Sequence, residues 1–134
     1  MIDAVFRAGA IEFDVDGFLA RHPELQPCGV WRVGEKDRLK RRSKTSGFNV
    51  LLVEDGKKME KVLSETRLEI ERLWPALRKL RRLNVEVEID FGVMVGSKMC
   101  FAPSILFPPE ALAWFSKRGL EIRVSSYPCS DDDE

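Results

Sequence analysis

The sequence lacks the residue patterns that would assign a chemistry directly. It has one histidine, and its three cysteines, Cys28, Cys100 and Cys129, stand too far apart for a metal-binding pair. Scattered cysteines in odd number are typical of a reducing compartment rather than of a disulfide framework. No P-loop, GxSxG, HExxH or CxxC motif is present. The sequence therefore argues against an enzyme, and we expect neither a cofactor nor a metal.

The chain also lacks an excess of one charge and a long apolar run. Its 22 basic residues balance 22 acidic ones, so bulk charge directs it toward neither nucleic acid nor a membrane. No apolar stretch approaches the roughly 20 residues that cross a bilayer, and no signal-peptide pattern opens the sequence. We therefore expect a cytoplasmic protein. Its 134 residues predict a single domain over residues 1–128, followed by an acidic C-terminal tail over 129–134.

Two segments, residues 11–16 and 85–91, alternate apolar and acidic side chains. Because strand side chains point to opposite faces in turn, each segment predicts a strand with one apolar and one acidic face. Asp16 is expected to cap the next helix. The remaining carboxylates, which we call the acidic row, form a predicted docking surface for a basic partner and belong to Glu12, Asp14, Glu86, Glu88 and Asp90. The alternative is a merely solvated strand face, and a cation site is disfavoured because alternate strand residues lie about 7 Å apart.

The remaining pattern predicts an α+β fold. Strands are expected over residues 4–13, 30–33, 48–53, 85–95, 99–106 and 120–127, with a hairpin at Gly96 and Ser97. Helices are expected over residues 17–22 and 108–117, with Gly119 as the C-terminal cap of the second. This order favours an antiparallel sheet of about six strands, with helices packed on one face and the other face left to solvent.

The longest predicted element is an amphipathic helix over residues 57–84. Apolar or small residues recur there at steps of four and three, at Met59, Leu63, Thr66, Ile70, Leu73, Leu77 and Leu80. Pro75 interrupts this pattern, since proline lacks an amide hydrogen and clashes with the preceding turn. We expect two closely joined helical segments, the second starting at Pro75.

Two further groups of residues offer other functions. A basic loop contains Lys36, Arg38, Lys40, Arg41, Arg42 and Lys44. It is a candidate for nucleic-acid contact, although Glu35 and Asp37 dilute its charge and nucleic acid remains the less favoured partner. It is also a candidate for meeting the acidic row of a second copy in a homo-oligomer.

The aromatic residues divide into one binding candidate and a predicted core. Trp31 ends a strand beside the basic loop, so it is the best candidate for a partly exposed binding residue. Core positions are expected for Trp74, Trp114, Phe101, Phe107 and Phe115.

A small hydrolytic enzyme is the weakest alternative. Such an enzyme would use Glu88 and Asp90 in a cleft. It would otherwise pair His22 with a nucleophile, for which the candidates are Cys28, Ser43 and Cys100.

The arrangement of these elements resembles a known family. A strand and a short capped helix precede Pro27 and the run Trp31-Arg32-Val33-Gly34-Glu35. Ser46 then leads a strand, a long helix is broken at Pro75, and a helix–strand pair ends in Tyr127. The pattern resembles small bacterial domains of unknown function with a tryptophan–glycine–glutamate signature, which are similar to immunity proteins of polymorphic and contact-dependent toxin systems.

The resemblance implies a function without catalysis. It implies a cytoplasmic protein that binds a cognate toxin domain directly, and it carries over no catalytic residue. Combined with the acidic row, it predicts that the protein occludes the basic active-site surface of a toxin such as a nuclease.

Overall fold

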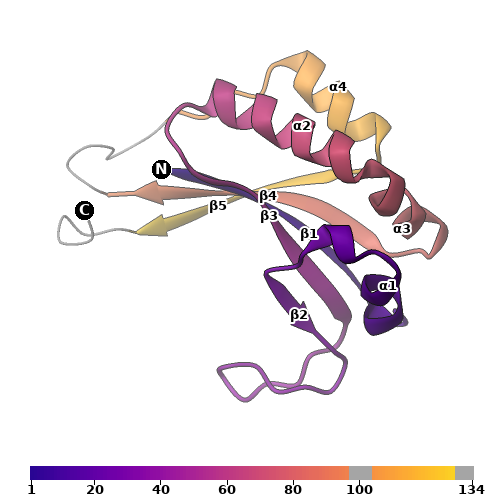
Figure 1. Ribbon diagram of the computed structural model, residues 1–134. Helices are drawn as coiled ribbons and strands as arrows, with labels where there is room; N and C mark the ends of the chain where they lie inside the picture. Colours follow the sequence, from indigo (N-terminus) through magenta and orange to yellow (C-terminus); the bar gives the residue numbers. More distant parts are fainter. Residues whose placement is uncertain (97–103, 129–134) are drawn as a thin grey trace.

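A computed structural model describes residues 1–96 and 104–128 as one mixed sheet with four α-helices (Figure 1). The strands are β1 (Ile2–Ala10), β2 (Gly29–Trp31), β3 (Ser46–Gly56), β4 (Glu86–Val95) and β5 (Glu121–Pro128). The helices are α1 (Val15–Arg21), α2 (Met59–Leu77), α3 (Lys79–Arg82) and α4 (Pro109–Lys117), with a 3-10 turn, η1 (Pro23–Leu25), after α1. The predicted α+β class is confirmed.

The sheet order is β2-β3-β1-β4-β5, and it departs from the expected antiparallel sheet of about six strands. The described residues form five strands, and β5 pairs parallel to β4. The predicted strand over residues 99–106 lies mainly outside the described residues, and residues 104–108 are not in a strand. Instead, α4 lies in the connection between β4 and β5, which returns the chain so that β5 runs parallel to β4. A parallel pair requires such a long crossover connection.

Strand β1 ends at Ala10, three residues before the expected end, which takes Glu12 and Asp14 off the sheet. The reason lies in its neighbours. Ala10 pairs with Ser46, the first residue of β3, and Gly9 pairs with Glu86, the first residue of β4. A longer β1 would have no partner for its backbone amides, so the chain turns instead.

The helices α2 and α4 cover one face of the sheet (Figure 1). Along β1 the buried residues are Ile2, Ala4, Phe6 and Ala8, which alternate with more exposed ones. The seven predicted stripe residues of α2 and α3 are all buried. Each large apolar side chain removed from water in this way contributes about 1.5–3 kcal/mol. The predicted apolar stripe is thus confirmed, over helices that begin at Met59 and end at Arg82 rather than over the whole of residues 57–84.

The predicted break at Pro75 is displaced. Helix α2 runs through Pro75 to Leu77, and α3 begins at Lys79. Pro75 is exposed, so its ring meets solvent rather than the sheet, and two joined helices form as expected but with a later boundary. By contrast, α4 ends as predicted, with Gly119 at φ +70° and a hydrogen bond from the Leu120 amide to the Phe115 carbonyl.

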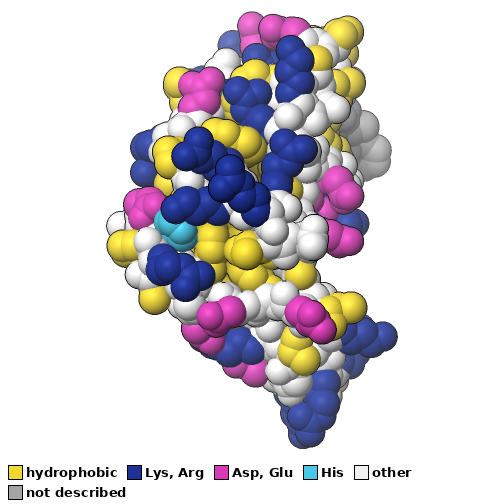
Figure 2. All heavy atoms as spheres, turned by 90° about the vertical axis from the view of Figure 1, so that its right-hand side faces the viewer, with side chains coloured by type: hydrophobic (Ala, Val, Ile, Leu, Met, Phe, Trp, Pro, Cys, Tyr) yellow, Lys and Arg dark blue, Asp and Glu magenta, His cyan; other side chains and the backbone are white. Residues whose placement is uncertain are grey.

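The end of the molecule at α1 and α3 carries Lys and Arg side chains around an apolar patch, beside the single histidine (Figure 2). Helix α1 lies there with Phe18 buried against Phe48 of β3, at a ring-centroid distance of 5.8 Å. Among the described residues, no helix is both long enough and apolar enough to span a membrane.

Candidate binding face

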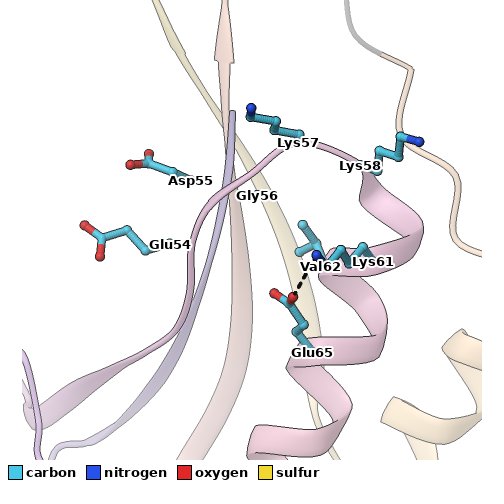
Figure 3. Close-up of a pocket in the computed structure, with 8 residues that line it drawn as sticks. All are labelled: Glu54, Asp55, Gly56, Lys57, Lys58, Lys61, Val62 and Glu65. Carbon is cyan, nitrogen blue, oxygen red and sulfur yellow. Dashed lines mark ion pairs between the residues drawn. The ribbon is translucent and has the colours of Figure 1, made fainter.

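The loop between β3 and α2 borders a hollow of about 570 Å³ (Figure 3). Its lining mixes three carboxylates with three amines, contributed by Glu54, Asp55, Glu65, Lys57, Lys58 and Lys61. Lys61 and Glu65 form an ion pair at 3.9 Å. Because the charges compensate, this hollow selects no ligand of one sign, and it is the weaker candidate.

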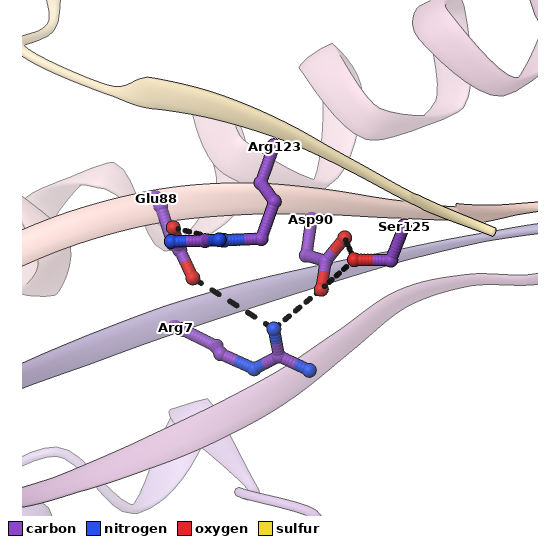
Figure 4. A network of polar contacts seen from close by, with 5 residues as sticks. All are labelled: Arg7, Glu88, Asp90, Arg123 and Ser125. Atoms are coloured by element: carbon purple, nitrogen blue, oxygen red, sulfur yellow. Dashed lines mark hydrogen bonds and ion pairs between the residues drawn. The ribbon is translucent and has the colours of Figure 1, made fainter.

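The stronger candidate lies on the face of the sheet that α2 and α4 leave uncovered, which we call the open face. Side chains that alternate with the apolar, core-facing ones point there, including Arg7 of β1, Glu88 and Asp90 of β4, and Arg123 and Ser125 of β5. Figure 4 shows these five side chains meeting on one face of β1, β4 and β5. The sheet therefore places acidic and basic groups from distant parts of the sequence side by side.

Asp90 is the centre of this polar network. It is 3% exposed, and the Arg7 guanidinium donates to its Oδ2. The Ser125 hydroxyl donates to both of its oxygens, at 2.8 and 3.1 Å. A buried carboxylate requires such partners, because an uncompensated charge away from water is costly.

Glu88 completes the network. Its Oε1 lies 3.7 Å from Arg7 Nη1, and its Oε2 accepts a hydrogen bond of 3.0 Å from Arg123 Nε. The hydrogen bond from Arg123 to Glu88 raises the pKa of this arginine. For Arg7, partial burial acts to lower the pKa, but the hydrogen bond and charge of Asp90, together with Glu88 and Tyr127, outweigh it, and the pKa is raised. Two of the predicted docking carboxylates are therefore neutralised within the sheet.

The two carboxylates before α1 have different positions from those predicted. Asp14, expected on the acidic row, caps α1 by accepting a hydrogen bond of 3.1 Å from the Gly17 amide. Asp16, the expected cap, instead accepts bonds of 2.7 and 2.8 Å from Arg32. The hydrogen bond from Arg32 lowers the pKa of Asp16. The predicted acidic row is thus not continuous.

Trp31 of β2 also lies on the open face, where its indole packs against two glycines. Gly9 of β1 and Gly47 of β3 are direct partners in the register. A Cβ added to Gly47 would lie 2.5 Å from Cζ2 of the indole, and one added to Gly9 would lie 3.4 Å from it. The indole nitrogen donates to the Thr45 hydroxyl at 3.1 Å. The half-buried ring is therefore held against the sheet with part of its surface free, which matches the expected partial exposure, and its role in binding stays a prediction.

Two adjoining hollows make a groove beside Trp31, which we call the Trp31 groove. One, of about 210 Å³, includes Arg7, Trp31, Glu88, Glu121 and Arg123 in its lining. The other, of about 570 Å³, includes Ile11, Glu12 and Asn84, and the two share Gly9, Thr45 and Glu86. The structure thus brings together four predicted site residues, Glu12, Trp31, Glu86 and Glu88, and leaves Asp14 and Asp90 outside the lining.

The groove carries a net negative charge. Its four carboxylates, from Glu12, Glu86, Glu88 and Glu121, face two guanidinium groups. Within the described part of the chain, Glu12, Glu86 and Glu121 form no ion pair. The sequence prediction missed Glu121, Arg7 and Arg123. The available signal for the two arginines was their alternating position in a strand. Only the strand order brings them next to Glu88.

The basic loop forms a turn closed by Asp37. The Leu39 and Arg41 amides donate to Asp37 Oδ1 at 2.8 and 2.9 Å. The hydrogen bond from the Arg41 amide, with further bonds and charge from the same turn, lowers the pKa of Asp37. Arg42 donates to the Gly34 carbonyl at 3.0 Å. Part of the loop's positive charge therefore stabilises the loop itself.

Among the described residues, His22 forms no hydrogen bond with Cys28 or Ser43, two of its candidate nucleophiles. The Nδ1 of His22 lies 3.3 Å from Glu24 Oε1. The Cys28 thiol donates to the Asn49 carbonyl at 3.5 Å, and the Ser43 hydroxyl donates to the Thr45 carbonyl at 2.8 Å. Cys100 and Phe101 lie outside the described residues.

The other aromatic predictions hold in part. Phe115 is buried, whereas Phe107, Trp74 and Trp114 are partly buried against the core. The Arg118 guanidinium lies 3.6 Å from the ring centroid of Trp114.

Comparisons with known proteins yield no relative: no family model matches the chain, and no curated protein or solved structure matches it significantly.

Proposed function

We propose that this protein acts by binding another protein in the Trp31 groove, and that the partner is a toxin domain with a basic active-site surface. One observation carries the proposal: the groove joins a partly exposed tryptophan to an excess of carboxylates on an uncovered sheet face. In this role the chain inhibits by occlusion and performs no catalysis. The toxin class comes from the sequence resemblance alone, and a nuclease is the example with the most suitable charge.

The groove's construction favours tight and selective binding. Aromatic side chains near the centre of an interface contribute most of the affinity, and Trp31 is already held by Thr45 and the sheet. Little conformational freedom is then lost on binding. Glu12, Glu86 and Glu121 provide negative charge that accelerates the encounter with a basic partner and disfavours acidic ones.

The hydrolase alternative receives less support from the same geometry. Glu88 and Asp90 are both hydrogen-bonded to arginine side chains. Both carboxylates are therefore occupied by contacts within the protein, whereas general acid–base chemistry requires a group that contacts the substrate.

The test begins with identification of the partner by cross-linked capture from the native cells, followed by titration calorimetry with the purified partner. The double variant Glu12→Lys/Glu86→Lys is expected to weaken binding at least about tenfold, because it reverses the charge of two carboxylates that line the Trp31 groove. Trp31→Ala is expected to weaken it about 30-fold, the effect of a typical hot-spot residue. Thermal unfolding of each variant verifies that the fold is retained.

The matched control is Glu60→Lys/Glu71→Lys on α2, which reverses the same number of charges away from the groove. Equal weakening by the control and the groove variant would refute the site. The inhibitory role has its own readout, the partner's toxicity with and without an equimolar amount of this protein. A partner whose activity is unchanged on binding would refute the immunity role and leave the binding site standing.

A further inference from the structure

A second charged surface lies at the end of the molecule where α1 meets α3, away from the open face. Five cations gather there, and we call them the α3 cluster: Arg21, Arg78, Lys79, Arg81 and Arg82. All five side chains belong to exposed residues. Figure 2 shows Lys and Arg side chains grouped over the middle of this end. Within the described residues, none of the five takes part in an ion pair.

The cluster is built by the tertiary structure from two parts of the chain. Arg21 ends α1, whereas Arg78, Lys79, Arg81 and Arg82 follow α2 without an intervening acid. Cations at the end of a short helix gain from its dipole, and this accounts for some of the charge on α3. Arg21 has the same favourable position at the end of α1, but the dipoles do not account for the shared hollow that Arg21 lines together with Lys79 and Arg82.

That hollow has a volume of about 540 Å³ and no acidic residue in its lining. Arg21, His22, Lys79 and Arg82 line it together with two apolar residues, Phe18 and Leu83. Leu83 is 47% exposed, which leaves apolar surface open between the cations. A ligand that fills this site therefore combines several negative charges with a less polar group.

We propose that the α3 cluster binds single-stranded nucleic acid through its phosphates, with one unstacked nucleoside placed in the hollow over Leu83. Phosphate binding by Arg and Lys clusters is independent of base sequence. A single strand can turn a base out of its stack, whereas a duplex keeps its bases paired and inaccessible. Arginine supplies four of the five cations, and its planar fork suits phosphate oxygens.

This site differs from the one that the sequence indicated. The basic loop over residues 36–44 was the expected nucleic-acid candidate, but Asp37 and the Gly34 carbonyl engage Arg41 and Arg42 there. The α3 cluster has no such internal partners among the described residues and borders a hollow. The proposal is independent of the Trp31 groove, whose lining contains none of the five cations.

The experiment measures the anisotropy of a labelled single-stranded RNA of about 20 nucleotides, longer than a typical single-strand site. Three to five phosphate contacts predict a slope of log affinity against log salt between about −2 and −3.5. Binding should therefore fall about 15- to 130-fold between roughly 50 and 200 mM KCl. An absence of binding at the lower salt concentration would overturn the proposal.

Two variants with the same change in net charge locate the site. Arg21→Glu/Lys79→Glu/Arg82→Glu reverses the cations that line the hollow, and it should weaken binding at least tenfold. Lys36→Glu/Arg38→Glu/Lys44→Glu reverses three exposed cations of the basic loop, and it should weaken binding less than threefold. Equal losses would mean that only net charge matters and would overturn the α3 site. Circular dichroism verifies that both variants remain folded.

The nature of the occupant is decided with two competing probes. A duplex of the same sequence should compete less well than the single strand, since its bases cannot enter the hollow. An acidic peptide of matched charge should compete least, because it offers no planar base. Stronger competition by the duplex or by the peptide would refute a single-stranded occupant. The variant Leu83→Asp should weaken binding of the single strand more than binding of the duplex. The reverse order would also refute a single-stranded occupant.

Discussion

The indole of Trp31 lies directly on Gly47, at a position where any side chain would collide with it. Gly47 faces Gly9 across the β1–β3 pair, so two adjacent strands present bare backbone at one point of the open face. Aromatic rings packed over glycine compensate for the missing side chains of the sheet. The relationship explains how a tryptophan on a strand of three residues is held firmly enough to line a groove.

Replacement of Gly47 by alanine is expected to destabilise the protein by about 1–3 kcal/mol, the usual cost of overpacking. The new Cβ would collide with the Ala8 carbonyl and the Trp31 ring. Gly9→Ala is the matched control, because its Cβ would meet the ring at 3.4 Å, and we expect a smaller loss. Urea unfolding followed by tryptophan fluorescence measures both changes. A larger loss for Gly9→Ala would contradict the close packing of Trp31 on Gly47.

Removal of the Arg7 side chain as Arg7→Leu is expected to lower the free energy of unfolding by about 1–3 kcal/mol, the usual cost of leaving a buried acceptor without its partner. Asp90, which is 3% exposed, would then retain only Ser125 as a partner in the network. Arg123→Leu is the comparison, with a clearly smaller expected loss, because the Arg123 side chain is 59% exposed and its ion pair is screened by water.

Chemical denaturation of the two single variants and of Arg7→Leu/Asp90→Asn tests this difference. The double variant should recover part of the stability lost in Arg7→Leu, because the charge left without a partner is also removed. No recovery would show that Arg7 stabilises the sheet by packing rather than by its charge.

The ion pair between Asp16 and Arg32 is expected to make a small contribution to stability that depends on pH. The pKa of Asp16 is lowered in the folded protein, chiefly by the Arg32 hydrogen bond. The contribution is therefore complete above the unfolded pKa of about 4 and is lost as the pH falls through the lower, folded value. Asp16→Asn should melt below the wild type at neutral pH, and the difference should shrink in acid. A difference that grows in acid would contradict this linkage.

Replacement of Pro75 by alanine is expected to stabilise the protein by about 1–3 kcal/mol. Pro75 lies inside α2, where it removes one helical hydrogen bond at an exposed position. Thermal and urea unfolding measure the gain. A loss of stability would mean that the proline is needed to direct the chain from α2 into α3.

The α3 cluster and the Trp31 groove illustrate which parts of a site can be predicted from sequence. Trp31, Glu86 and Glu88 were predicted as binding residues from a local signal, a strand end or an alternating strand. All three line the groove, and their role in binding stays a prediction. Glu121 lies beside Glu88 only because β5 pairs parallel to β4. Arg21 joins α3 only because α1 folds over the end of the sheet. Neither relationship has a local signal, since both depend on strand order and packing.

The sequence by itself determined the features that depend on spacing along the chain. The apolar stripe from Met59 to Leu80, the helix that begins at the paired prolines Pro108 and Pro109, and the alternation of β4 follow from helical and strand periods. Only the tertiary structure decided the electrostatic character of the sheet. Arg7 meets Asp90 across 83 residues of sequence, and no local pattern encodes that distance. The acidic row is consequently neutralised at its centre and remains negative only along the groove, because ion pairing depends on which strands become neighbours.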